Sequence, residues 1–280
     1  MHPRQPEIIA SLHVTRPFAA AEDVAVETRR RIDFFKDALR SSGLRSLVLG
    51  ISGGVDSLVA GRMAQLAVEQ LRAEHKGPRY RFIALRLPYR RQHDEADARA
   101  ALDFIGADHV HYLDIAASVD ALGTRLGALG VLPDARRDPV RCNIKARMRM
   151  VAQFAVANAL DGLVIGTDHA AEAVLGFFTK FGDGACDLAP LSGLVKAQVR
   201  RIARHLGAPA HLVDKVPTAD LEDACPGRPD ELAHGISYAQ IDAFLLGQDI
   251  DPRVAQRIVA SFDASRHKRE LPLSPVPRQP

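Results

Sequence analysis

The chain has 280 residues, of which 37 are Lys or Arg and 34 are Asp or Glu, so its formal net charge is +3. A composition of 47% hydrophobic and 25% charged residues is that of a globular protein and excludes a disordered or collagen-like chain. No apolar run approaches the roughly 20 residues that span a bilayer, and the small charge does not indicate a nucleic-acid partner. Cys142, Cys186 and Cys225 lie far apart and form no CxxC pair, so we expect reduced thiols and a cytoplasmic location.

Short apolar runs alternate with segments of helical periodicity in the first 165 residues. Helices are expected at residues 22–41, 55–75 and 93–105, with a further helical face between residues 144 and 159; strands are expected at residues 46–51, 81–87, 109–114 and 163–165. Strands that are apolar throughout, separated by helices, predict an α/β fold with a doubly wound parallel sheet and helices on both faces. Ligands bind such sheets beyond the carboxyl ends of the strands, here after Gly50, Leu87, Asp114 and Ile165.

The remainder of the chain carries weaker signals of secondary structure. Residues 182–236 are rich in Gly, Pro and Asp, so we expect them to be dominated by loops, with a functional role. The proline-rich end from Leu271 is expected to be irregular. We expect a single domain over residues 1–280, with a core at about residues 22–270.

A glycine-rich segment, Gly50-Ile-Ser-Gly-Gly-Val-Asp-Ser57, joins the first strand to a helix. Adjacent glycines allow a sharp turn and close approach to a ligand, and the free N–H groups of the helix start attract anions. The segment lacks the Gly-Lys-Ser/Thr of a Walker A loop and is not a GxGxxG loop. Asp56 would repel a phosphate unless Mg²⁺ lies between them; the alternative is that Asp56 is an ordinary helix N-cap. We interpret the whole string as a phosphate loop.

Two further segments follow the fourth strand. Gly166-Thr-Asp-His-Ala-Ala-Glu-Ala173 contains Glu172, which is a candidate for the second Mg²⁺ carboxylate or for a solvated residue at a helix start. Gly176-Phe-Phe-Thr-Lys-Phe-Gly-Asp-Gly184 would suit a flat heteroaromatic ring, although such a segment on its own more often reflects core packing and a surface turn.

The loop at Gly50–Ser57 resembles that of the ATP pyrophosphatase group, whose members adenylate a substrate. The two later segments resemble the ammonia-dependent NAD synthetase family. The resemblance extends over about residues 25–270 and continues in Arg86-Leu-Pro-Tyr89, Asn143-Ile-Lys-Ala-Arg147, Pro190-Leu-Ser-Gly-Leu-Val-Lys196, Pro217-Thr-Ala-Asp-Leu-Glu-Asp223, Pro229-Asp-Glu231 and His267-Lys-Arg269. The resemblance implies a Rossmann-like, adenine nucleotide alpha hydrolase-like fold. It also implies a ligase that uses ATP, Mg²⁺ and ammonia to convert deamido-NAD to NAD through an adenylated intermediate, releasing AMP and pyrophosphate.

The resemblance assigns roles to particular residues. The ATP site would consist of Gly50, Ile51, Ser52, Gly53, Gly54, Val55, Asp56, Ser57, Thr167, Lys196 and Thr218. Asp56 and Glu172 would hold Mg²⁺, and Asp183 and Lys196 would be catalytic. Deamido-NAD would contact Arg147, Phe177, Lys180, Asp187, His267 and Lys268. The alternatives are that Lys196 is a solvated residue at a helix start and that Asp183 and Asp187 only form turns.

The resemblance also implies a homodimer, with the dinucleotide site at the subunit interface and residues 143–156 in an interface helix. The pattern of that helix alone would place it in the core. Residues 218–236 match a loop that closes over the site. No membrane or nucleic-acid partner is expected.

The sequence departs from the family pattern at several positions. Val55 and Leu58 replace a usual Gln and a usual hydroxyl residue, and Arg90-Arg91 replaces a small or apolar pair. The C-terminal end lacks the acidic, aromatic character that is usual in bacterial relatives. No segment resembles a glutaminase, so free ammonia is the expected nitrogen source, with a separate glutaminase partner left open. Two rival functions also remain open: another adenylating ATP pyrophosphatase, and a non-catalytic nucleotide sensor.

Overall fold

The computed structural model describes residues 2–75, 79–90, 94–131, 133–218 and 227–270, together with Pro272 and Pro275. Arg91, Cys225, the segment 219–226 and most of the tail from Leu271 lie outside the described residues. Within the described part, Cys142 and Cys186 form no disulfide, and no helix has the length and apolar character of a membrane span.

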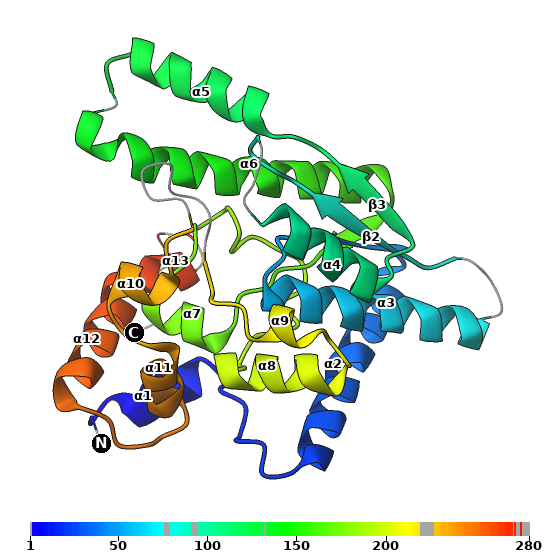
Figure 1. Ribbon diagram of the computed structural model, residues 1–280, viewed down its shortest axis with the longest axis horizontal. Helices are drawn as coiled ribbons and strands as arrows, with labels where there is room; N and C mark the ends of the chain where they lie inside the picture. Colours follow the sequence, from blue (N-terminus) through cyan, green and yellow to red (C-terminus); the bar gives the residue numbers. More distant parts are fainter. Residues whose placement is uncertain are drawn as a thin grey trace.

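The strands form one parallel sheet, which lies in the upper right part of the view in Figure 1. Its strands are β1 (Ser46–Gly50), β2 (Arg81–Arg86), β3 (His109–Tyr112) and β4 (Gly162–Val164), in the order β3-β2-β1-β4. All three strand pairings are parallel. The chain winds from β1 outward to β3 and then returns to β4 on the other side of β1. The carboxyl end of β1 is therefore the switch point at which such sheets bind ligands.

Successive residues of β1 pack into different cores because side chains of a strand alternate between its faces. Leu47 and Leu49 belong to a core built with α2 (Ala21–Ser42), α3 (Val55–His75) and α4 (Glu95–Ile105). Val48 belongs to a core built with α5 (Ala116–Ala128) and α6 (Arg137–Ala159). Helices thus cover both faces, which confirms the doubly wound α/β fold.

A second helical region packs beside the sheet and has its own apolar core. It contains α1 (Gln5–Ser11), α7 (Ala170–Leu175), α11 (Tyr238–Leu245) and α12 (Pro252–Ala264). Figure 1 shows these helices on the side of the molecule opposite α5. The short helix α13 (Arg266–Arg269) follows α12.

Loops make up most of the described part of residues 182–236, as expected, but helices lie among them. In residues 182–218 and 227–236 these are α8 (Lys196–His205), α9 (Ala210–Val213) and α10 (Asp230–His234). Helix α8 buries Val199, Ile202 and Ala203 against α2 and α3. This short helical pattern was obscured by the Gly and Pro residues on either side of it.

The burial of two expected helix faces also differs from the prediction. Val26, at helical spacing in α2, is 67% exposed, and its neighbour Val24 is buried instead. Val151 on α6 is 49% exposed, and Ala155 and Ala159 are exposed as well. The apolar face of α6 is therefore wider than the part that the sheet covers.

Candidate active site

A cavity of about 540 Å³ opens at the carboxyl ends of β1, β2 and β4. Residues from Gly50 to Ser57, from Leu85 to Leu87 and from Ile165 to Thr167 contribute to its wall. The expectation that the end of β3 also contributes was wrong, because Asp114 lies outside this wall and instead accepts a hydrogen bond from the Ala116 N–H. Beyond the end of the short β3, its chain turns into α5 and moves away from the switch point.

The Gly50–Ser57 segment forms a tight loop that is held by its own hydroxyl groups. Ser52 Oγ lies 3.1 Å from Ser57 Oγ and accepts a hydrogen bond from the Gly54 N–H at 3.2 Å. Gly53 has φ +91°, and a Cβ atom there would lie 2.9 Å from the backbone nitrogen of Ala98, so both its conformation and its surroundings require glycine. The start of α3 directly follows the loop, so its free N–H groups suit an anion in the cavity.

The loop is also anchored to the opposite face of the sheet. The Gly50 N–H donates to Gln153 Oε1 on α6 at 2.7 Å. All of the residues expected in the ATP site line the cavity apart from Gly53, which turns the loop behind them.

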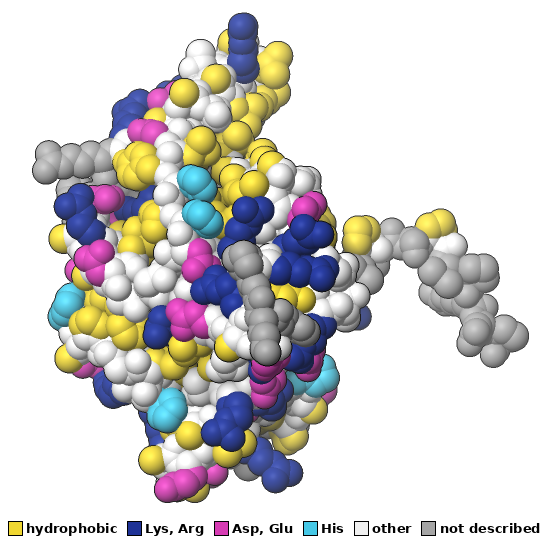
Figure 2. Space-filling view, turned by 90° about the vertical axis from the view of Figure 1, so that its right-hand side faces the viewer, with side chains coloured by type: hydrophobic (Ala, Val, Ile, Leu, Met, Phe, Trp, Pro, Cys, Tyr) yellow, Lys and Arg dark blue, Asp and Glu magenta, His cyan; other side chains and the backbone are white. Residues whose placement is uncertain are grey.

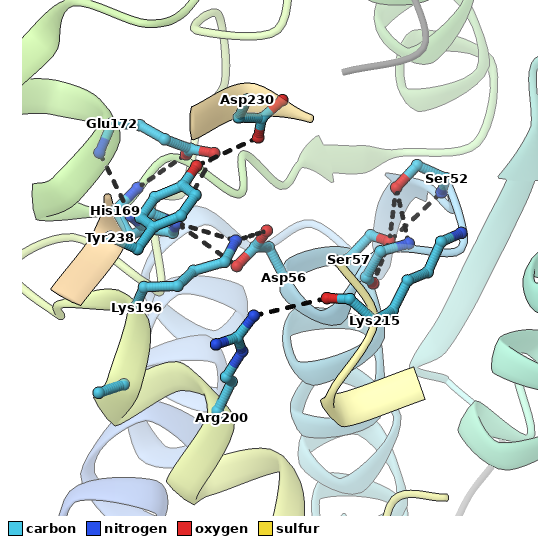
Figure 3. Close-up of polar contacts among 12 residues, drawn as sticks. Ser52, Asp56, Ser57, His169, Glu172, Lys196, Arg200, Lys215, Asp230 and Tyr238 are labelled. Atoms are coloured by element: carbon cyan, nitrogen blue, oxygen red, sulfur yellow. Dashed lines mark hydrogen bonds and ion pairs between the residues drawn. The ribbon is translucent and has the colours of Figure 1, made fainter. Parts of the chain in front are cut away.

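Asp56 and Lys196 meet in the cavity although 140 residues separate them in the chain. Lys196 Nζ donates to Asp56 Oδ2 at 2.7 Å, and the lysine is only 2% exposed (Figure 3). Burial lowers the pKa of Lys196, but the charges of Asp56 and Glu172 more than offset this, and the pKa lies above its usual value. Lys196 is thus a buried ammonium at the start of α8, and the solvated alternative is excluded.

Glu172 and His169 complete a small group of ligating atoms with Asp56. One ligand atom from each of these residues lies within 4.8 Å of the other two. Burial and the negative charge of Asp56 raise the pKa of Glu172 well above its usual value. Burial and the Lys196 ammonium lower the pKa of His169 to about 3, so its ring is neutral at pH 7.

The residues of this group fit a divalent cation. Asp56 Oδ1 is buried and has no hydrogen-bond partner, which leaves a carboxylate oxygen available for a cation. Two carboxylates beside a phosphate loop are the oxygen ligands that suit Mg²⁺. A bound cation would also offset the repulsion that raises the pKa of Glu172.

Another part of the cavity wall is formed by the segment after α7 and by α13. Phe177, Asp183 and Lys268 line the cavity there. The Phe177 ring lies edge-on to His234, with 5.3 Å between ring centroids. Lys268 Nζ donates to the carbonyls of Gly176 and Phe178 at 2.8 and 2.9 Å, and it therefore fixes the backbone around Phe177.

Asp183 has both a structural contact and access to the cavity. Its Oδ1 accepts a hydrogen bond from the Thr179 N–H at 3.0 Å, while its side chain remains part of the cavity wall. Burial raises the pKa of the Asp183 carboxyl group above its usual value. The two readings of Asp183, as a turn former and as a site residue, are therefore compatible.

The other expected deamido-NAD residues lie outside the cavity wall. Arg147 donates to the Lys180 carbonyl at 3.2 Å, and Lys180 Nζ donates to the carbonyl of His267. Asp187 accepts a hydrogen bond from the Val164 N–H at 2.8 Å, so it holds the end of β4. Arg147, Lys180 and His267 form a separate surface cluster, which the cavity of a single chain does not reach.

Two departures from the family pattern have a structural explanation. Leu58 is fully buried in the core of α3 and does not line the cavity. Arg90 has a 63% exposed side chain, which pairs with Asp120 at 2.7 Å and also lies outside the cavity wall.

Several residues of the site have no role that was expected from the sequence. His169 lies within the Gly166–Ala173 segment, so its motif could have revealed it. Asp230 lies within the Pro229-Asp-Glu231 segment, so its motif could also have revealed it. Gln153 and Tyr238 have no local signal, because each reaches the site from a helix that is distant in sequence.

A phosphate loop at the switch point of a parallel sheet, with a buried lysine and paired carboxylates in one cavity, defines a nucleotide-binding α/β protein. The family model described as NAD synthase matches residues 27–272. The chain therefore belongs to the NAD synthase family, which confirms the resemblance found in the sequence.

Known proteins support this membership over almost the full chain. The "NH(3)-dependent NAD(+) synthetase" of Ectopseudomonas mendocina (strain ymp) is 62% identical over 275 residues, covering 98% of this chain and 100% of the relative. A crystal structure of NAD+ synthetase from Burkholderia pseudomallei is 54% identical, with a TM-score of 0.81 over 96% of this chain and 97% of that one. A structure of NMN synthetase from Francisella tularensis is 31% identical, with a TM-score of 0.77 over 90% of this chain and 98% of that one.

Proposed function

We propose that this protein is an ammonia-dependent NAD synthetase, a ligase that uses ATP to convert the nicotinate carboxylate of deamido-NAD into the amide of NAD. The observation that carries the proposal is the meeting of the Gly50–Ser57 loop, Lys196 and the Asp56–Glu172 carboxylates in one cavity. The proposal is also supported by the 62% identity of this chain to the NH(3)-dependent NAD(+) synthetase of Ectopseudomonas mendocina.

ATP binds with its phosphates on the Gly50–Ser57 loop in this proposal. The N–H groups of the loop and of the start of α3 hold the phosphate oxygens, and Thr167 and Thr218 in the cavity wall contact the nucleotide. The nicotinate carboxylate attacks the α-phosphate, the bond to the β-phosphate breaks, and pyrophosphate leaves. Lys196 places a positive charge where negative charge develops.

Asp56 and Glu172 would hold Mg²⁺, with His169 beside them. When it is bound, the cation neutralises charge on the phosphate oxygens. Lys196 already neutralises Asp56 in the structure. Asp56 would therefore serve both the lysine and the cation.

Ammonia then attacks the adenylated carboxylate, and AMP leaves. Asp183 can take a proton from ammonium because its carboxylate lies in the cavity wall. Phe177 contributes a flat apolar surface for the nicotinate ring, and Lys268 holds its backbone. The wall excludes water, which would otherwise hydrolyse the intermediate.

We further propose a homodimer in which the surface cluster of one subunit, formed by Arg147, Lys180 and His267, lies next to the cavity of the other subunit. Exposed hydrophobic side chains occur on β3, on α5 and its C-cap, and on α6: Val110, Tyr112, Leu122, Leu129 and Val151. Figure 2 shows hydrophobic side chains on the upper part of one face, at the height of α5 and α6 in Figure 1. Such a patch is typical of a protein interface. In a dimer through this face, the Arg147, Lys180 and His267 cluster would bind the distal part of deamido-NAD.

The chain is proposed to act as a single domain in the cytoplasm. The two cores adjoin through α7 and α8, which favours one folding unit. The absence of a disulfide between Cys142 and Cys186 is compatible with a reducing compartment.

The test is an assay with ATP, Mg²⁺, deamido-NAD and ammonium, in which NAD and AMP are measured. NAD formed with ammonium and not with glutamine is the expected result. A parallel reaction contains nicotinic acid mononucleotide, because one similar structure is that of an NMN synthetase. Preference for the mononucleotide would overturn the assignment of deamido-NAD. Tight ATP binding without AMP formation from either substrate would favour a nucleotide sensor or another adenylating enzyme.

A further inference from the structure

Lys196 receives contacts from two residues of helix α11 that lie on one face of that helix. Tyr238 and Asp242 are four residues apart, so both point toward the start of α8. Asp242 contacts the backbone of the lysine, and Tyr238 contacts its ammonium group.

The backbone contact compensates for a poor helix start. The N-cap residue of α8 is Val195, whose side chain cannot accept a hydrogen bond. Asp242 supplies the missing acceptors: Oδ1 accepts from the Lys196 N–H at 3.1 Å, and Oδ2 accepts from the Ala197 N–H at 2.7 Å. This carboxylate from another helix therefore fixes the position of the Lys196 Cα atom.

The side-chain contact fixes the direction of the ammonium group. Lys196 Nζ lies 5.1 Å from the centroid of the Tyr238 ring and 2.7 Å from Asp56 Oδ2 (Figure 3). Tyr238 is 5% exposed and Lys196 is 2% exposed, so water does not screen the attraction between the ring and the charge. The ring and Asp56 together leave the ammonium little freedom to turn away from the phosphate loop.

The Tyr238 hydroxyl group connects this arrangement to the segment that carries Thr218. It donates to Asp230 Oδ2 at 3.2 Å. The Asp230 N–H in turn donates to the Pro217 carbonyl at 3.0 Å, and Thr218 pairs with Pro229. The residue expected to contact ATP is therefore linked to the residue that holds Lys196.

We propose that Tyr238 is a positioning residue for the adenylation step: its ring, with Asp242 behind it, holds the Lys196 ammonium at the phosphate loop. This inference rests on the proposed function, in which Lys196 contacts ATP. The competing explanation is that Tyr238 only packs in the second core, with neighbours such as Ile236 and Ile241.

A double-mutant cycle between Tyr238 and Lys196 separates these explanations. The variants are Tyr238→Leu, Lys196→Gln and the double variant, and calorimetry measures their affinity for α,β-methylene-ATP with Mg²⁺. Tyr238→Leu should weaken binding by about tenfold in the wild-type background, as expected for loss of a desolvated cation–π contact. It should change binding by less than about twofold in the Lys196→Gln background, where no ammonium remains to be positioned.

Two further variants serve as controls. Tyr238→Phe keeps the ring and should restore most of the affinity. Tyr80→Leu removes an equally buried tyrosine, 6% exposed, beside the amino end of β2, and should leave nucleotide affinity unchanged. If Tyr238→Leu does not fold, Tyr238→Met replaces it in the same cycle, since it also removes the aromatic ring that contacts the ammonium.

Equal losses in the two Lys196 backgrounds, or an equal loss from Tyr80→Leu, would overturn the inference. The cycle does not depend on NAD formation, so the two proposals fail separately. Coupling in the binding cycle with no NAD formed by the wild-type protein would overturn the proposed function alone. NAD formation without coupling would overturn the positioning role alone.

Discussion

The sheet region and the second helical region build their parts of the cavity in different ways. The phosphate loop lies within eight consecutive residues, and its shape is held by hydrogen bonds inside the loop. Lys196 is instead held by Asp56 from α3 and by Tyr238 and Asp242 from α11. A local motif therefore specifies the loop, whereas the packing of distant helices specifies the position of the lysine.

This difference has a consequence for substitutions. A change in the phosphate loop should act on the site directly. A change in the second region should act through Lys196 or through the backbone around Phe177.

The largest effect is expected where the two regions meet, at Asp56. Asp56→Asn keeps a polar partner for Lys196 and removes the carboxylate, so Mg²⁺-dependent AMP formation should fall by about a thousandfold. AMP release is measured by chromatography across a Mg²⁺ titration, and thermal unfolding reports on the fold. Asp114→Asn, at the end of β3 and outside the cavity wall, is the matched control. Activity within tenfold of wild type would remove Asp56 from the metal site.

The next effect concerns the exposed apolar face of the sheet region. Val151→Glu places a charge on the part of α6 that the sheet leaves uncovered, so it should weaken dimerisation by about a hundredfold. Sedimentation velocity over a concentration series gives the dissociation constant. Val26→Glu, on the exposed side of α2, should leave the dimer intact. If Val151→Glu sediments like the wild-type protein, the interface lies elsewhere.

A smaller effect is expected from the aromatic wall of the second region. Phe177→Ala should raise the KM for deamido-NAD by about tenfold, because an aromatic contact with the nicotinate ring is lost. The KM for ATP should change by less than about twofold, since Phe177 is not part of the phosphate loop. Phe181→Ala, which alters a 56% exposed ring outside the cavity wall, is the control. Equal increases in the two KM values would assign Phe177 a packing role.

The smallest effect concerns Asp168, beside the second region. Burial, with the charges of Asp183 and Asp56, raises the pKa of Asp168 to about 8. The folded protein therefore binds more protons than the unfolded chain between about pH 4 and pH 8, and its stability falls as pH rises through this range. Asp168→Asn should recover about 1 kcal/mol of the free energy of unfolding at pH 8.5 relative to pH 6. Urea unfolding in EDTA measures this difference, and parallel pH profiles for the two proteins would contradict it.

Much of the sheet region could be predicted from the sequence because its signals are local. The four strand positions and the helices at 21–42, 55–75 and 95–105 agree with apolar runs and helical spacing to within a few residues. Burial was harder to predict: the exposed Val151 and the buried Ile144 on α6 have the same apolar character. Only the packing of α6 on the sheet distinguishes them.

The parallel fold, the glycine-rich loop and the family could be inferred from the sequence, because each is indicated by short segments of neighbouring residues. Tertiary structure decided that Lys196 is buried, that Asp56 Oδ1 is available to a cation and that Tyr238 lies over the lysine. It also separated Phe177 and Lys268 in the cavity from Arg147, Lys180 and His267 on the surface. The charge and burial of a side chain depend on groups that folding brings together from distant segments, such as Asp56 and Lys196. A local sequence pattern does not indicate such contacts.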